Sequence, residues 1–340
     1  SSANPTFGVR YKPLSDVMLR ASYGTGFLPA SVHQIVPAPA PTLLPAFIFP
    51  ILGLTDPRRG DEFVGASLAP GQNVVALSGG NPDLDPEESE SWSAGLVLTP
   101  RFVPGLRVSA DWTRTEKTGN IGFVIPTLQA NLDLEQLIPG LVTRDTNPAT
   151  FGTFGVGPII GLDARLRNVA FTQVEAYDFA VDYRWASERF GEFMLSSAAT
   201  HYVHNETRAV PLAPLVENTG TITGLPWRGH ATLSWDYKNW TASWTARYFD
   251  SYQLFAADQE NAAVIQTQGA PRVPSQTYHD LFASFRFDSQ AEWLSGTEIQ
   301  IGVNNVFNTR PPVDVTQSLL YSTLGDPRLA SYYVSLRKAF

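Results

Sequence analysis

Histidine and cysteine, the residues that most often bind metals or transfer protons, are sparse in this sequence. It has no cysteine and five histidines, His33, His201, His204, His230 and His279. His201 and His204 lie three residues apart in a segment with strand-like alternation, so we expect them to point to opposite faces and not to share a metal ion. The pattern therefore predicts no zinc-type cluster.

An acidic run and the serines are the remaining residues that could do chemistry. The run consists of Asp83, Asp85, Glu87, Glu88 and Glu90, whose carboxylates would suit calcium, but it lacks the spacing and central glycine of an EF-hand loop. We interpret the run as a conformationally restricted segment that leads into a strand, because one proline precedes it and another interrupts it. No G-x-S-x-G nucleophile elbow joins a strand to a helix. We expect neither an enzyme nor a bound cofactor.

The composition indicates many strands and few charges. Charged residues are 16% of the chain, where an ordinary soluble domain has about 25%. Aromatic residues reach 12%, and there are 26 glycines and 26 prolines, which favour strands joined by turns. The net charge of −8 excludes a general nucleic-acid binder. The longest apolar stretch, 42–54, is too short for a transmembrane helix and contains two prolines.

Strands are the elements that would position the polar residues. Apolar and polar residues alternate with a period of two in eleven segments, most of them long enough to cross a membrane. We expect strands at 6–11, 17–23, 90–98, 106–116, 171–185, 191–205, 227–237, 240–249, 276–287, 297–307 and about 328–340.

Short and long connections alternate between these segments. The long ones cover about 24–89, 117–170, 206–226, 250–275 and 308–327. A membrane barrel has short turns on one side and long loops on the other, whereas a soluble sandwich has no reason to keep this order.

Charged residues avoid the aromatic face of these segments, except Lys338, which lies two residues from the chain end, where its side chain can reach the membrane interface. In 240–249 the aromatic face carries Trp240, Trp244 and Tyr248, while Arg247 lies in the opposite register. An arginine that faced lipid at mid-membrane would cost about 2–4 kcal/mol, and one in a wet lumen would not. A soluble antiparallel sandwich also alternates, but its outer faces would carry more charge than these faces of Ser, Thr, Gly and Ala. The pattern favours an antiparallel transmembrane β-barrel.

Five stretches, in order, resemble the C-terminal half of the barrel of TonB-dependent outer-membrane receptors. They are NPTFGVRYKPLSDVMLRASYGTGF (4–27), GGNPDLDPEESESWSAGL (79–96), LPWRGHATLSWDY (225–237), IGVNNVFN (301–308) and the last strand. The resemblance implies that residues 1–340 are the C-terminal portion of a barrel of about 22 strands, with the plug domain absent. A physical argument also requires further strands, because an eleven-stranded sheet in lipid would leave two edges with unpaired backbone groups. We therefore expect a fragment or a processed chain.

This resemblance also implies a function and partners. The expected function is active import of a scarce small-molecule nutrient, such as a ferric siderophore or a carbohydrate, across the outer membrane of a Gram-negative bacterium. The TonB complex would act through the missing N-terminal region, and outer-membrane lipid and lipopolysaccharide would surround the barrel. The terminal Phe340 resembles the signal that the outer-membrane barrel assembly machinery recognises. A passive porin or diffusion channel and a soluble β adhesin are the alternatives.

The first long loop contains two adjacent arginines, Arg58 and Arg59, in the sequence TDPRRGDEF. Outside the cell these guanidinium groups could bind an anionic ligand such as a ferric chelate or a sugar acid. They could also bridge lipopolysaccharide or neighbouring loops. They are the candidate substrate contacts that we take from the sequence, and the substrate itself is not determined.

Overall fold

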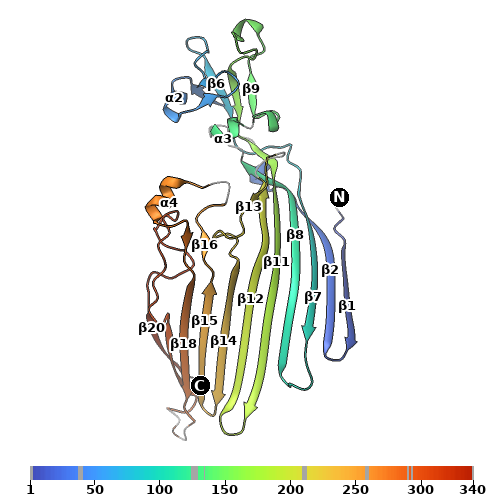
Figure 1. The fold of residues 1–340 in the computed structure, drawn as a ribbon, viewed down its shortest axis with the longest axis vertical. Coiled ribbons are helices and arrows are strands. Elements are labelled where there is room, and N and C mark those ends of the chain that lie inside the picture. The colour runs from blue at the N-terminus through green and yellow to red at the C-terminus, as the bar shows by residue number, and fades with distance from the viewer. Residues whose placement is uncertain are drawn as a thin grey trace.

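A large antiparallel sheet dominates the protein (Figure 1). The computed structural model describes residues 3–36, 41–123, 129–133, 135–208, 213–256, 260–288, 291 and 294–338. Its main sheet has twelve strands, of which eleven form an up-and-down meander and the twelfth, β13 (Val216–Glu217), pairs with β12. This meander confirms the expected wall of a barrel.

The meander, called the wall below, matches the eleven predicted segments in number and order. Its strands are β1 (Thr6–Leu14), β2 (Val17–Leu28), β7 (Glu87–Leu98), β8 (Leu106–Phe123), β11 (Leu166–Ser187), β12 (Gly191–Arg208), β14 (Trp227–Tyr237), β15 (Trp240–Phe249), β18 (Gln276–Arg286), β19 (Thr297–Asn304) and β20 (Ser331–Lys338). Strands β1 and β20 form the two edges of the sheet.

The strands near the middle of the wall are longer than expected. β8 continues seven residues past the predicted end at 116, and β11 begins five residues before the predicted start at 171. Their pairing continues through two register shifts near Ala170. Bulges and polar residues interrupt the alternation there, so a period-two pattern could not show that the ladder goes on.

The register puts apolar and polar residues in separate rows across the wall. One row of direct cross-strand neighbours contains Leu195, Leu233, Trp244, Leu281 and Val303. The adjacent row contains Asp182, Ser196, Thr232, Thr245 and Asp280. Directly opposed residues share a face, so the sheet has one apolar face and one polar face, as predicted.

The apolar face of the wall is not covered by other described parts of the chain. Trp244 is 40% exposed and Val334 is 73% exposed. The buried hydrophobic clusters of the described residues are centred on loop residues at the ends of the strands. A soluble sandwich would bury these aromatic residues between two sheets, so that alternative is wrong.

Two long loops fold together into a small unit, the loop subdomain, beyond the ends of the wall strands (Figure 1). Its four-stranded sheet has the order β3 (Thr42–Pro45), β6 (Asn73–Leu77), β10 (Ile159–Asp163), β9 (Val142–Arg144), and β6 and β10 are parallel. The other elements are α2 (Ile48–Leu52), β4 (Thr55–Asp56), β5 (Glu62–Phe63), α3 (Gln129–Leu132), η1 (Glu135–Leu137) and η2 (Pro148–Thr150). Its core contains Phe49, Leu54, Val64, Val74, Leu132, Ile159 and Leu162.

The later loops contain shorter elements of their own. These are β16 (Tyr252–Gln253), α4 (Ala262–Gln268) and β17 (Arg272–Val273), while α1 (Val32–Ile35) follows β2. Buried Leu225, Tyr252 and Val273 pack together above β14 and β15. The Tyr252 hydroxyl donates to the fully buried Asp314 at 2.7 Å, so the loops before β18 and β20 are held together.

Candidate functional site

Cross-strand ion pairs line the polar face of the wall. Arg20 donates to both carboxylate oxygens of Asp111 at 2.7 and 2.6 Å, across the intervening strand β7. Gly95 lies between them, and a Cβ there would be 1.8 Å from Asp111 Oδ1. Arg247 also forms an ion pair, with Asp280 at 3.0 Å, but these two residues lie on the directly adjacent strands β15 and β18. Both arginines thus lie on the predicted face and have carboxylate partners.

The polar face also contains a recess of about 260 Å³ near the loop ends of β14 and β15 and beside the middle of β12. Its polar lining consists of Thr200, Arg228, His230 and Arg247. Arg228 is exposed and donates to the Tyr202 hydroxyl at 3.2 Å, with its Cζ 5.5 Å from the centre of the Tyr202 ring. This recess is called the wall recess below.

Arg59, a predicted candidate for substrate contact, is buried in the loop subdomain. Its Nε donates to Glu62 at 2.5 Å, and its other nitrogens donate to Ser67 and to three backbone carbonyls. The side chain is 4% exposed and also packs against the Phe154 ring. Arg59 therefore joins two long loops, which is the structural alternative that the sequence left open.

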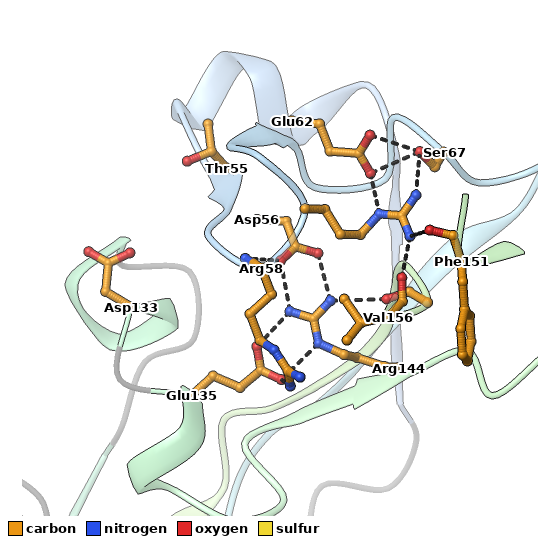
Figure 2. A network of polar contacts seen from close by, with 12 residues as sticks. Thr55, Asp56, Arg58, Glu62, Ser67, Asp133, Glu135, Arg144, Phe151 and Val156 are labelled. Atoms are coloured by element: carbon orange, nitrogen blue, oxygen red, sulfur yellow. Dashed lines mark hydrogen bonds and ion pairs between the residues drawn. The ribbon is translucent and has the colours of Figure 1, made fainter. Parts of the chain in front are cut away.

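Arg58 lies at the edge of a second network, which is centred on Arg144 (Figure 2). Arg144 donates to both oxygens of Asp56 at 2.8 and 2.7 Å and to both oxygens of Glu135 at 2.8 and 2.6 Å. Burial by itself would lower the pKa of Arg144, but the two carboxylates outweigh it and the pKa is raised. Arg58 reaches Glu135 at 3.4 Å and is 37% exposed.

The two networks differ in what they imply for Arg58 and Arg59 as predicted substrate contacts. Arg59 has its guanidinium engaged on every nitrogen, so it is poorly placed to bind an external anion. Arg58 stays a predicted ligand contact. No sequence pattern pointed to Arg144, because its partner Asp56 is 88 residues away in a different loop.

The expected opposite orientation of His201 and His204 is wrong. His201 is opposite Tyr177 and His204 is opposite Glu175, and these two partners lie on one face of β11. A register shift between Glu175 and Ala176 marks a bulge in β12, which adds a residue and returns His204 to the face of His201. His201 stacks on Trp227, with 4.4 Å between ring centres.

One group of possible metal ligands occurs among the described residues. His204, Glu206 and Glu217 each offer a ligand atom, and these atoms lie within 4.8 Å of one another. His204 Nδ1 is 3.0 Å from Glu217 Oε2, beyond the His201–Trp227 stack. Glu217 already accepts bonds from two backbone amides and His204. The group forms an internal ion pair that fixes β13 to β12.

The ion pair between His204 and Glu217 lies outside the membrane-spanning part of β12. It shifts the pKa values of both side chains. The hydrogen bond from His204 to Glu217 raises the pKa of His204 above 6.5. Burial by itself would raise the pKa of Glu217, but the bonds from His204, Thr219 and the backbone amides lower it to about 2.

Glu87 of the acidic run, which the structure describes, has a structural role. In the acidic run, the Glu87 carboxylate accepts from the Ile121 amide and pairs with Lys117, which ties β7 to β8. Phe340, the predicted assembly signal, lies outside the described residues. None of the described helices is long and apolar enough to span a membrane.

Comparisons with known proteins agree with this architecture. The family model described as TonB dependent receptor-like, beta-barrel matches residues 1–306. The crystal structure of the siderophore receptor PirA from Acinetobacter baumannii has a TM-score of 0.57 and 14% identity, over 99% of this chain and 41% of that chain.

A double mutant of the ferric enterobactin receptor PfeA from Pseudomonas aeruginosa has a TM-score of 0.58 and 14% identity, over 98% of this chain and 39% of that chain. The chain thus spans about two fifths of the length of these receptors, and at this identity the likeness shows the fold. No match was found among curated proteins.

Proposed function

Because the chain belongs to the TonB-dependent receptor-like β-barrel family, we propose that residues 1–340 form the C-terminal portion of the barrel of an active outer-membrane importer. The localisation that follows from this membership is the outer membrane of a Gram-negative bacterium. The observation that carries the proposal is the family match over residues 1–306, which include ten of the eleven wall strands.

The family and the wall geometry support import rather than the alternatives. This family consists of receptors and transporters, so an enzyme has no support, and a passive porin is disfavoured because porins form a separate class of barrel. The polar face would line the lumen and the apolar face would contact lipid, since a charge on the lipid side is costly. In this arrangement the chain supplies the lumen wall and several outer loops.

Cargo and partners are proposed as follows. The ligand is a small molecule such as a ferric siderophore or a carbohydrate, captured from outside between the loops. The TonB complex acts through an N-terminal region of the whole receptor. Lipopolysaccharide surrounds the outer ends of the strands, and the barrel assembly machinery recognises the strand that ends at Phe340.

Uptake measurements test the proposal. A strain that lacks the gene, and the same strain complemented with the whole gene, would be given iron-55 chelates and radiolabelled oligosaccharides. We expect the gene to increase accumulation of one cargo, and a protonophore to abolish that increase, because import is energised from the inner membrane. Gene-dependent uptake that a protonophore leaves unchanged would identify a diffusion channel instead.

A further inference from the structure

We propose that the wall recess binds an anionic, carboxylate-bearing group of the imported ligand, with Arg228 as the principal contact and His230 and Arg247 beside it. This inference rests on the proposed function and adds the charge class of the ligand. Three observations support it: the free donors of Arg228, the charges around the recess and its position in the wall.

Most N–H donors of the Arg228 guanidinium make no hydrogen bond to the described residues. Its one hydrogen bond is to Tyr202, an uncharged partner, and it forms no ion pair with any described residue. Each other arginine of the polar face considered above, Arg20 and Arg247, has a carboxylate partner. Guanidinium groups bind carboxylates through two parallel hydrogen bonds, so Arg228 is suited to an external carboxylate.

The described arginines and aspartates around the recess are equal in number, three of each, but Arg228 is the one arginine among them without an ion pair. Arg247 is neutralised by Asp280, while Asp178 accepts from Thr200 and Asp326 of the last outer loop pairs with Arg328. His230, directly opposite Arg247, makes no hydrogen bond or ion pair with the part of the chain that the structure describes. An anion would therefore meet Arg228 without displacing an existing partner.

The recess lies where an incoming ligand would arrive. Arg228 is the second residue of β14 and Arg247 is the third from the end of β15, both at the loop ends of these strands. Its volume of about 260 Å³ is below the roughly 300–1,000 Å³ of pockets that enclose a drug-sized ligand. The recess therefore suits one charged group of a larger ligand.

Calorimetric titration of the whole receptor, folded in detergent micelles, tests the proposal. The anionic probes are ferric citrate and glucuronate, which separate a ferric chelate from a sugar acid. Glucose and the cationic chelate ferrioxamine B are the charge controls. We expect an anionic probe to bind best and Arg228→Gln to weaken it about 10- to 100-fold, because hydrogen bonds to charged groups are strong.

The matched control is Arg184→Gln. Arg184 is also on the polar face, but it lies near the turn end of β11, pairs with Glu192 and is 70% exposed, so the affinity should stay unchanged. If Arg228→Gln does not give a folded, heat-modifiable barrel, the His230→Glu receptor is titrated with the same probes instead. It should weaken ferric citrate or glucuronate to the same extent and leave glucose unaffected.

Three results would overturn the proposal. One is a wild-type receptor that binds neither anionic probe more tightly than the controls. Another is an Arg228→Gln receptor that keeps full affinity for the anionic probe. The third is an equal loss for all four probes, which would mean that Arg228 holds another part of the receptor in the lumen. Since binding is measured without an energised membrane, these results are independent of the uptake test.

Discussion

Arg144 offers the clearest test of how the loop subdomain is stabilised. Its guanidinium lies between Asp56 and Glu135, and the three side chains are 11%, 2% and 11% exposed. Arg144→Met keeps the aliphatic stem but removes the cation. It would leave two carboxylates close together, one of them buried without a counter-charge.

The expected cost can be estimated from this geometry. Removing one partner of a buried ion pair destabilises by about 3–5 kcal/mol, because the remaining charge is left uncompensated. Each 1.4 kcal/mol is a tenfold change, so the open form of the subdomain should become roughly 100- to several thousand-fold more populated. The increase stops when the subdomain is fully open.

Limited proteolysis of the folded receptor in micelles measures this population. When reclosing is faster than cleavage, the cleavage rate follows the population of the open form. Chymotryptic cleavage after Leu54 is the readout, because Leu54 is buried in the subdomain core and is followed by a residue other than proline. Heat-modifiable migration in gels verifies that the barrel is intact.

Two further variants separate the network from general effects. Arg101→Met removes an arginine that is 79% exposed and pairs with Asp16, and it should change the rate only slightly because surface pairs contribute about 0–1 kcal/mol. Replacing both Asp56 and Arg144 by leucine should restore most of the protection, since the most deeply buried carboxylate is removed together with its counter-charge and Glu135 keeps Arg58. The reasoning is refuted if Arg144→Met is cleaved after Leu54 at the wild-type rate.

Three other predictions concern the wall and its outer edge. Ala242→Arg, on the apolar face, should lower stability in vesicles by about 2–4 kcal/mol in urea titrations, whereas Ser243→Arg on the polar face should change it little; equal losses would contradict the assignment of faces. The raised pKa of His204 means that its ion pair stabilises fully below pH 6.5 and weakens as pH rises through the folded value. Glu217→Gln should therefore move the NMR titration midpoint of His204 downward, and an unmoved midpoint would show that the pair does not form in solution. Gly105→Ala, in the turn before β8, should destabilise the barrel by about 1–3 kcal/mol. The reason is that φ of Gly105 is +87° and the new Cβ would be 2.0 Å from the Arg184 carbonyl oxygen. An unchanged midpoint of urea unfolding would argue against this turn conformation.

The sequence was sufficient for the wall because the wall is periodic. A strand in a single sheet between lipid and water must alternate, so residues such as Trp244 and Arg247 reveal their faces without reference to any other strand. The number of strands and the alternation of turns and loops follow in the same way. The strand ends at 123 and 166 were missed because polar residues and bulges continue the ladder beyond the bilayer.

The sequence was less informative about the candidate site. Arg228 and His230 could be placed on the polar face by their register, but alternation does not tell which polar-face cation lacks a partner. That depends on the neighbouring strands, where Arg247 has Asp280 and Arg228 has only Tyr202. The orientation of His204 likewise depends on a bulge that is set by its pairing with β11.

What the amino-acid sequence determined alone was the wall: its strand order, its two faces and the family to which it belongs. What only the tertiary structure decided was the loop layer. There, residues far apart in the chain, such as Asp56 and Arg144, meet in one buried network and parallel strands form between separate loops. Such contacts have no period and no fixed sequence spacing, so only the folded chain can select them.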